Sequence, residues 1–359
     1  MGNCAPKPKP QSGPRPPNPS TAPAAAPAPA PAVRLYGSES CLTSSRLRLA
    51  LLYKSVPYQF VPRDSPLLGR PFLQCGPDTL VGADHTLFRE LDSRFPCPRV
   101  AADALAKIGK SRWPTPAGTE ADEVALVTAL QHRSLERHVE ELGRWAAEMA
   151  GGGRGRGDSA RMGRSYGLVV ELVMEHAQME ERLLFPALEA AADQAVCKVA
   201  NEEHARDLPL INGIKEDIKS TVVMEAGTPF HQEALLNLSS RFKTLEEHFK
   251  EHFQEEEKKL FPLLEMTIKS QMSLKAQMEE EENAPLSSLS WTEQLMSTME
   301  TTHSPRLFPF LMAGLRPEEA MQYLALVCRH KQDQHQLVSM LRSLIAYLET
   351  KDMPPLKCL

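Results

Sequence analysis

Two eleven-residue stretches, HAQMEERLLFP at residues 176–186 and HFQEEEKKLFP at residues 252–262, decide the fold of this chain. Both follow the pattern H-x-x-x-E-E-x-x-L-F-P. On a helix, residues four positions apart lie on the same face, about one turn from each other. Each stretch therefore presents one imidazole and one carboxylate to the same volume. Because a buried carboxylate is costly unless it is paired or binds a metal, two such helices facing each other predict a polar cavity inside a bundle.

Two more histidines repeat in the same way. His132 lies in LQHRSL and His204 lies in EEHARDL, and each precedes one of the two eleven-residue stretches. The bundle would then consist of two helical hairpins, each with a histidine on its first helix and a histidine and a glutamate on its second. This pseudo-twofold arrangement suits a pair of metal ions. The candidate metal ligands are His132, His176, Glu180, His204, His252 and Glu256.

The ligand types indicate which metal to expect. Four imidazoles and two carboxylates, with no thiolate among them, favour iron, with manganese and zinc as the alternatives. Two carboxylates that bridge two ions leave coordination positions open, and open positions on iron bind dioxygen, nitric oxide or peroxide. We therefore expect two iron ions as the cofactor and small diatomic molecules as ligands.

Neighbouring residues offer alternatives to this ligand set. Glu181 and Glu257 are candidates to replace the glutamates that precede them, although we expect both to face solvent. His138 and His248 lie near candidate ligands in the sequence, and we interpret them as flanking residues. The alternative to a metal site is a helical bundle that keeps its shape without binding a metal.

With these residues the chain resembles the hemerythrin family, in its HHE cation-binding branch, over about residues 123–270. It is similar to bacterial di-iron proteins implicated in iron-centre repair and to the hemerythrin domains of iron-sensing ubiquitin ligases. The resemblance implies that the four candidate histidines are terminal ligands and that Glu180 and Glu256 bridge. Oxygen-carrying hemerythrins have a second histidine one turn after the position of His204, where this chain has Leu208. The resemblance therefore implies sensing, iron handling or a redox reaction rather than reversible oxygen carriage.

Leu, Ala, Glu, Met, Gln and Lys dominate residues 120–350, so we expect this part of the chain to be helical. Thr119, followed by Asp122 and Glu123, is a typical helix start. Long helices with short connections predict an antiparallel four-helix bundle. The expected bundle helices span residues 121–150, 163–192, 195–225 and 230–270. Shorter helices are expected at residues 289–302, 305–314 and 317–350, packed on the bundle, with His303, His330 and His335 mostly exposed.

Residues 33–97 alternate between short strands and helices and predict a small α/β domain. The strands are expected at residues 33–36, 58–61, 71–74 and 79–81, and the helices at residues 42–54 and 84–94. The stretches that carry a further resemblance are LYGS at 35–38, SRLRLAL at 45–51, PY at 57–58 and LFRELD at 87–92. They resemble the N-terminal, thioredoxin-like domain of glutathione transferases, in which Pro71 would correspond to a cis-proline.

A serine or cysteine at a helix N-terminus has a stabilised anion, which makes Ser40 and Cys41 the candidate thiol site. Three departures argue against glutathione chemistry. Asp84-His85 replaces the Glu-Ser pair of the transferases, one helix after the second strand is missing, and the helical half of the transferase cleft is replaced. We therefore favour a docking role for this domain, toward a protein partner. The alternative function is a glutathione-dependent transferase or a thiol-redox protein.

Composition excludes several classes of protein. The chain has 359 residues and a net charge of −5, which argues against a nucleic-acid partner. Its seven cysteines are scattered, as is typical of reduced thiols in a cytoplasmic protein. No apolar run reaches the roughly 18 residues that a membrane-spanning helix needs.

Residues 1–32 are rich in proline and alanine and predict a disordered tail. Gly2 is a candidate acceptor for myristate and Cys4 for palmitate, although Pro6 stands where a serine or threonine is usual. Two acyl chains would anchor the protein to a membrane surface. The alternatives are an unmodified tail and an organelle transit peptide.

The sequence as a whole predicts a multi-domain chain and assigns no catalytic residue. The expected parts are the tail at 1–32, a thioredoxin-like α/β domain at 33–97, a linker at 98–122, an all-α hemerythrin-like bundle at 123–273 and a C-terminal helical cap at 286–350.

Overall fold

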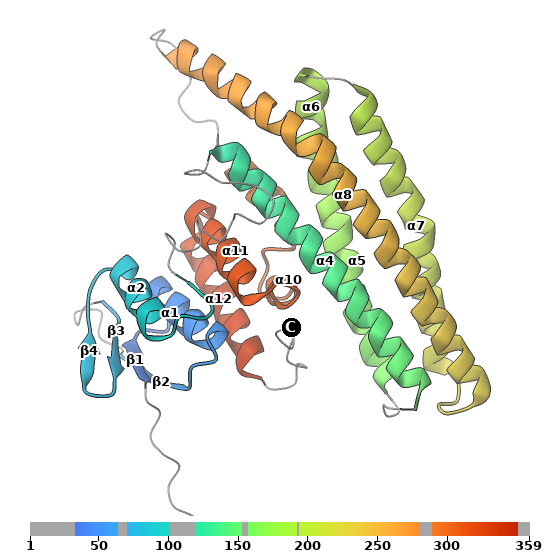
Figure 1. The fold of residues 1–359 in the computed structure, drawn as a ribbon, viewed down its shortest axis with the longest axis horizontal. Coiled ribbons are helices and arrows are strands. Elements are labelled where there is room, and N and C mark those ends of the chain that lie inside the picture. The colour runs from blue at the N-terminus through green and yellow to red at the C-terminus, as the bar shows by residue number, and fades with distance from the viewer. Residues whose placement is uncertain are drawn as a thin grey trace, which may run out of the picture. The chain divides into compact units, whose positions relative to one another are not determined.

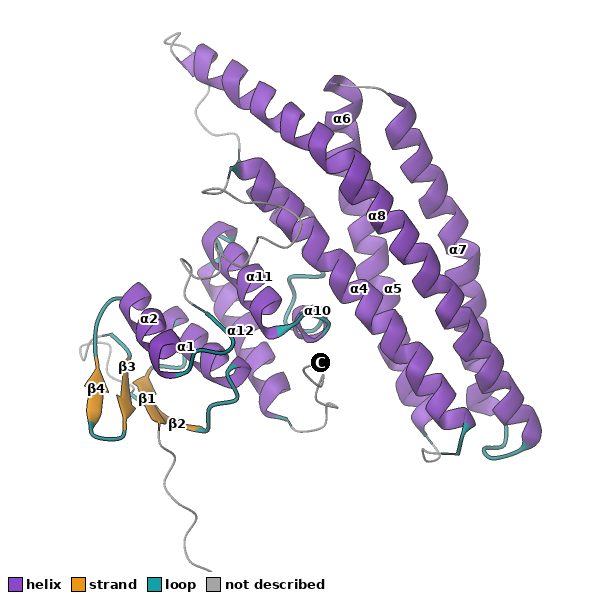
Figure 2. Cartoon of the chain, in the orientation of Figure 1, coloured by secondary structure: helices purple, strands orange, loops and turns teal. Residues whose placement is uncertain are grey.

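The computed structural model describes residues 33–63, 70–100, 119–152, 157–191, 194–279 and 289–350. Among these residues, strands occur only in the N-terminal α/β part, where Figure 2 shows them in orange. The described helices include none that is long and apolar enough to cross a membrane. Gly2 and Cys4 lie outside the described residues, as does most of the expected linker, so acylation and the linker stay predictions.

The N-terminal part is a four-stranded sheet with two helices. Its elements are β1 (Val33–Gly37), α1 (Leu42–Tyr53), β2 (Tyr58–Pro62), β3 (Phe72–Cys75), β4 (Asp78–Leu80) and α2 (Asp84–Arg94). The strand order is β2-β1-β3-β4. β1 pairs in parallel with β2 and antiparallel with β3, and β3 pairs antiparallel with β4. The parallel pair requires a crossover connection, and α1 supplies it.

The sequence of β1 explains its central place in the sheet. Val33 and Leu35 are buried, and Gly37 lies so close to α1 that an added Cβ atom would come within 2.3 Å of the Ser44 hydroxyl oxygen. Each expected strand and helix of this part lies within two residues of an observed one. The expected cis-proline at Pro71 is wrong, because the cis peptide bond among the described residues precedes Pro98. The resemblance to a thioredoxin-like domain stays a prediction.

Four long helices form the bundle (Figure 1). They are α4 (Glu120–Ala150), α5 (Asp158–Met179), α7 (Gln194–Val223) and α8 (Pro229–Glu279). Each helix packs against two others in the closed order α4-α5-α7-α8. As predicted, α4 begins after Thr119: the Thr119 hydroxyl accepts a hydrogen bond from the Asp122 N–H, and the Asp122 carboxylate accepts one from the Thr119 N–H. This capping box satisfies backbone donors that the helix itself leaves free.

The two repeated stretches differ in their backbone. In the first stretch, α5 continues through one π-helical turn, η2 (Glu180–Leu184), into α6 (Phe185–Ala191). The π turn precedes Pro186, whose ring has no N–H and would clash with the preceding turn of a regular α-helix. The corresponding Pro262 lies inside α8. The phenylalanines before both prolines, Phe185 and Phe261, are buried as expected.

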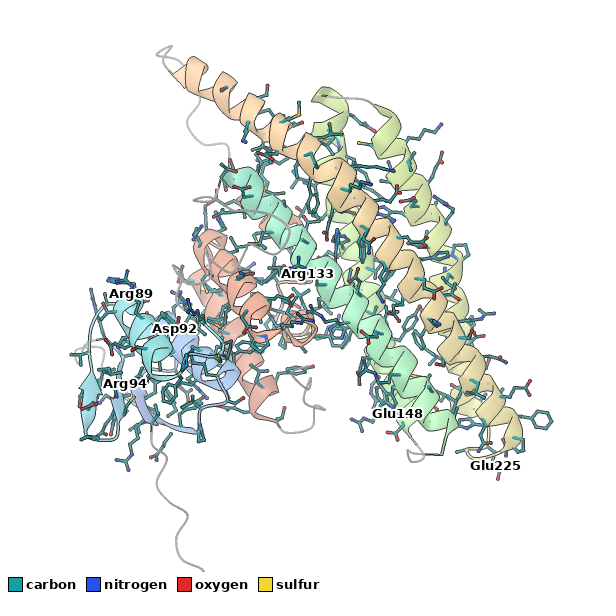
Figure 3. The ribbon with its side chains drawn as sticks, viewed as in Figure 1. Arg89, Asp92, Arg94, Arg133, Glu148 and Glu225 are labelled. Atoms are coloured by element: carbon teal, nitrogen blue, oxygen red, sulfur yellow. The ribbon has the colours of Figure 1, made fainter. Side chains whose placement is uncertain are left out.

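The C-terminal segment contains one helix more than expected. Its helices are α9 (Trp291–Thr298), α10 (Phe308–Ala313), α11 (Pro317–His330) and α12 (Gln334–Glu349). α9, α10 and α11 pack on α4. The guanidinium of Arg137 on α4 lies 2.5 Å from the Glu319 carboxylate on α11, and Arg133, labelled in Figure 3, lies 3.7 Å from the same carboxylate. The C-terminal helices are therefore attached to the first bundle helix.

Helix α12 has a different neighbour from the one that the sequence predicts. It packs against α1 of the N-terminal part as well as against α10. The Glu349 carboxylate accepts hydrogen bonds from Arg48, at 2.9 Å, and from the Tyr58 hydroxyl, at 3.0 Å. The C-terminal helices thus contact both the bundle and the α/β part.

The expectation that the C-terminal histidines are exposed is wrong for two of three. His303 is fully buried and lies 3.0 Å from the Tyr323 hydroxyl. His330 is largely buried, with its Nε2 atom 2.7 Å from the Glu123 carboxylate on α4. His335 is exposed as expected. Burial of the first two follows from packing between helices, which no local pattern reports.

Candidate metal centre

Six polar side chains meet in the interior of the bundle. α4 supplies His132, α5 supplies His176, the π turn supplies Glu180, α7 supplies His204, and α8 supplies both His252 and Glu256. Five of them are buried, and the side chain of His204 is 12% exposed. They include two groups able to hold a metal ion, with ligand atoms within 4.8 Å of one another: His132, His176, Glu180 and Glu256, and separately His204, His252 and Glu256.

The two carboxylates lie between two pairs of imidazoles. Oε1 of Glu180 lies 3.4 Å from Nε2 of His176, and its Oε2 lies 3.4 Å from Nε2 of His204. Oε2 of Glu256 lies 3.5 Å from Nε2 of His132, and its Oε1 lies 2.9 Å from Nε2 of His252. Each carboxylate therefore presents one oxygen to each pair.

Several of these atoms lack the partners that burial requires. Oε2 of Glu180 and both carboxylate oxygens of Glu256 are buried and have no hydrogen-bond donor among the described residues. Such orphaned acceptors are rare in folded proteins and call for an explanation. Cations between the carboxylates and the Nε2 atoms would satisfy them. The residues present therefore fit a metal site.

The outer nitrogen of each imidazole also has a polar neighbour. Nδ1 of His132 lies 3.2 Å from the Glu257 carboxylate, and Nδ1 of His204 lies 3.0 Å from the Glu181 carboxylate. Nδ1 of His252 lies 3.2 Å from the Glu203 carboxylate. Such partners orient imidazole ligands and leave Nε2 free to bind metal.

The expectation that Glu181 and Glu257 face solvent is confirmed for Glu181 and wrong for Glu257. Glu257 is only 14% exposed and lies behind His132, whereas Glu181 is 45% exposed but still contacts His204. Both carboxylates lie on the Nδ1 side of an imidazole, away from the centre. Their position follows from the twist of the helix, which turns adjacent residues about 100° apart.

The fourth imidazole, His176, has a neutral partner. Its Nδ1 lies 2.8 Å from Oε1 of Gln131, one residue before the candidate ligand on α4. Burial lowers the pKa of His176 well below its usual range, and the positive charge of neighbouring histidines lowers it further. His176 is therefore a neutral imidazole, the form that binds metals.

Three other groups of the centre, His204, His252 and Glu180, have pKa values raised above the usual range. Burial lowers the pKa of His204, but the Glu180 carboxylate, 3.4 Å from Nε2, outweighs burial together with Glu181 and Glu256 and raises the pKa to about 9. The pKa of His252 is raised in the same way, chiefly by Glu256. Burial and the charge of Glu256 raise the pKa of Glu180. Metal binding must displace any protons on these groups, because the ligands bind in their deprotonated forms.

This geometry agrees with the comparison to known protein families. Residues 127–264 match the hemerythrin HHE cation binding domain. The matched range contains all six side chains of the centre and most of the four bundle helices. Comparisons with curated proteins and with solved structures found no match to the chain. The match and the His/Glu cluster together support a cation-binding domain in this part of the chain.

The flanking histidines of the hemerythrin domain do not reach the centre. His138 stacks on Phe310 at 3.9 Å between ring centroids and donates from Nε2 to the Phe310 carbonyl oxygen. The side chain of His248 is 49% exposed, with Nδ1 3.5 Å from Asp207. Leu208 is 41% exposed, so the position one turn after His204 does not supply a ligand.

Two hollows in the hemerythrin domain lie beside the centre. A groove of about 460 Å³ reaches His252 and is lined by the carboxylates Glu203, Asp207, Glu251 and Glu255, among other residues. A smaller pocket of about 200 Å³ reaches Glu256, and its apolar lining includes Val199, Ala200 and Leu260. The smaller pocket beside Glu256 is therefore largely apolar, although Glu203, Glu255 and Lys259 also line it, and the neighbouring groove is polar.

The candidate thiol site lies in the N-terminal part, at the start of α1. Cys41 is the residue before the first turn of α1, and the Ser40 hydroxyl lies 2.9 Å from the Ser38 hydroxyl. The carboxylate of Asp84 accepts a hydrogen bond from Thr43 at 2.8 Å and lies 3.6 Å from Arg46. These contacts tie α2 to α1, and they give Asp84 a role in holding the domain together.

Proposed function

We propose that the hemerythrin domain binds two iron ions and that the protein senses or handles iron, dioxygen or nitric oxide. The observation that carries this proposal is the position of the two carboxylates. Glu180 and Glu256 each present one oxygen to the His132/His176 pair and the other to the His204/His252 pair. A carboxylate in that position is suited to bridging two cations.

The proposal gives each residue a role. His132 and His176 would hold one ion, His204 and His252 would hold the other, and the two glutamates would bridge them. Imidazole nitrogen and carboxylate oxygen suit iron, whereas a structural zinc site closes four positions and prefers thiolates. Manganese and zinc are the alternative metals.

The ligand count and the small pocket support binding of a small molecule. Iron with an open coordination position would supply affinity for dioxygen or nitric oxide. The apolar lining of Val199, Ala200 and Leu260 favours entry of small uncharged molecules over ions. The position one turn after His204 supplies no ligand, because it holds Leu208, which is exposed. One ion would therefore keep an open coordination position, which favours sensing or reaction over stable oxygen carriage.

The test is the metal content of the full chain, purified without oxygen and supplied with ferrous iron. Elemental analysis should find about two irons per chain in the wild type. A variant with His176→Ala and His252→Ala should lose them. The matched control carries His138→Ala and His248→Ala, which remove two histidines of the bundle helices α4 and α8 outside the centre, and it should keep both irons.

Each outcome decides the proposal. Two irons that disappear only in the first variant would support the di-iron site and direct attention to its reactions with nitric oxide and dioxygen. Absence of bound metal after iron reconstitution would refute it. Equal loss of iron in both double variants would also refute the assignment of ligands.

A further inference from the structure

A line of buried polar groups connects the centre to the C-terminal helices. The Gln131 amide, which contacts His176 through Oε1, lies with Nε2 3.2 Å from the Tyr323 hydroxyl of α11. The Tyr323 hydroxyl lies 3.0 Å from Nε2 of His303, and Nδ1 of His303 lies 3.3 Å from the Met296 carbonyl oxygen. Gln131, Tyr323 and His303 are at most 2% exposed.

The direction of every hydrogen bond in this line follows from its far end. The Met296 carbonyl only accepts, so Nδ1 of His303 carries the proton and its Nε2 is an acceptor. The Tyr323 hydroxyl must then donate to His303 and accept from the Gln131 N–H. That places the Gln131 oxygen toward His176, where it accepts from Nδ1–H. The lone pair of His176 Nε2 then faces the centre, where Nε2 of His132 lies 3.1 Å away.

Only His176, among the four imidazoles of the centre, needs such a line. The other three have carboxylates beside Nδ1. Those of Glu257 and Glu181 hydrogen-bond to His132 and His204, and the negative charge of Glu203, 3.2 Å from Nδ1 of His252, favours the Nδ1–H form there. A glutamine amide has an oxygen at one side and a nitrogen at the other, and it can turn either way. If Gln131 turned, its N–H would face Nδ1 of His176, the ring proton would move to Nε2, and the ligand atom would be blocked.

The turn before His303 is hydrogen-bonded to α5, next to the centre. The Glu175 carboxylate, adjacent to His176 on α5, accepts a hydrogen bond from the Thr301 N–H at 2.7 Å. It also accepts from the N–H and the hydroxyl of Thr302. The turn that presents His303 is thus held to the same helix as the imidazole that the line orients.

We propose that Tyr323 and His303 are positioning residues of the metal centre, which fix the orientation of Gln131 and so keep Nε2 of His176 free to bind metal. The C-terminal helices are then part of the centre, and their docking on α4 is coupled to metal affinity in the His132/His176 half. This inference rests on the proposed di-iron function.

The test compares two Tyr→Phe variants of the full chain in anaerobic titrations with ferrous iron. Tyr323→Phe should weaken binding of one of the two irons roughly 10-fold, the lower end of the effect of removing a partner behind a ligand. Tyr166→Phe is the matched control, because it removes a buried hydroxyl that donates to the Ile211 carbonyl at 2.8 Å inside the bundle. It should leave both affinities unchanged.

A second pair of variants tests the direction of the line. His303→Gln can accept from Tyr323 and donate to Met296, so it should retain wild-type iron affinity. His303→Leu can do neither and should resemble Tyr323→Phe. Nitrogen NMR of histidine-labelled, iron-free protein should show His176 protonated at Nδ1 in the wild type and in His303→Gln, and a shift toward Nε2 in the other two.

The readouts separate the two proposals. Unchanged iron affinity and an unchanged His176 proton position in Tyr323→Phe would overturn the positioning role. An equal loss of iron affinity in Tyr166→Phe would also overturn it, because the effect would then be one of general stability. If the wild type binds no iron, the di-iron proposal fails, and the role of the line in iron binding fails with it, whatever the NMR spectrum shows.

Discussion

Glu180→Gln should stabilise the iron-free protein while it abolishes stabilisation by iron. The substitution keeps the size of the side chain but removes one negative charge next to Glu256. In the iron-free protein Oε2 of Glu180 is buried without a donor, and burial together with Glu256 raises the Glu180 pKa. The amide that replaces this carboxylate would donate to Nε2 of neutral His176, which lies 3.4 Å from Oε1 of Glu180.

The magnitude follows from the cost of an unsatisfied buried group, about 1–3 kcal/mol. We therefore expect the iron-free variant to gain about 1–3 kcal/mol in unfolding free energy, with about 2–4 °C in Tm for each kcal/mol in a domain of this size. Iron at 100 times its Kd should add about 2.7 kcal/mol to the wild type. The variant lacks one bridging carboxylate and should gain far less.

The assay is anaerobic thermal unfolding followed by circular dichroism, with and without ferrous iron. Glu181→Gln is the matched control, because it makes the same change one residue later at a side chain that is 45% exposed. It should leave most of the iron-induced increase in Tm. An equal iron-induced increase in wild type and Glu180→Gln would refute the bridging role, and a lower iron-free Tm would refute the argument from burial.

Four other perturbations have defined outcomes. Because the pKa of His204 is about 9, iron affinity should rise with pH up to about 9. The protonated ring stabilises the iron-free protein, and this stability should be lost as the pH rises from about 6.5 through 9. A pH-independent Kd for iron would contradict this. Burial lowers the pKa of His138 to about 4, so the unfolding free energy should fall as the pH drops from about 6.5 toward 4. In urea titrations, His138→Gln should reduce this pH dependence by up to about 1.4 kcal/mol per pH unit. An equal pH dependence in the wild type and the variant would contradict the assignment to His138. Val199→Trp should fill the small apolar pocket and slow nitric oxide binding in stopped-flow absorbance without changing the iron content. An unchanged binding rate would exclude entry of nitric oxide through this pocket. Arg137→Ala breaks the ion pair between α4 and α11, so it should lower the unfolding free energy by about 1–3 kcal/mol and raise hydrogen exchange in α10 and α11. Arg144→Ala removes an exposed ion pair within α4 and should do neither. Equal effects of the two variants would contradict the attachment of the C-terminal helices through Arg137.

The repeated stretches show how much of the site is encoded locally. The four-residue spacing of His176 and Glu180 and of His252 and Glu256 fixes their common face once a helix forms, and the structure brings all four together. Helix starts are equally local, since Thr119 and Asp122 cap the helix that they begin. These features are predictable because each depends on residues within one or two turns.

The surroundings of the site are not encoded in this way. The sequence predicts Glu257 in solvent, but its carboxylate lies behind His132, which is 125 residues away in the sequence. No sequence pattern points to Tyr323, although its hydroxyl contacts Gln131 at a separation of 192 residues. A glutamine directly before a candidate ligand was the only signal available for this line, and a lone glutamine indicates nothing specific.

The sequence by itself determined the helical bundle, the six candidate ligands and the small α/β part, because periodicity, capping and strand alternation act over a few residues. Only the tertiary structure decided which nitrogen of His176 faces the centre, the burial of His303 and the packing of α12 on α1. These depend on contacts between helices far apart in the chain. Hydrogen-bond direction and packing across such distances are set by how whole helices pack, and no short stretch contains that information.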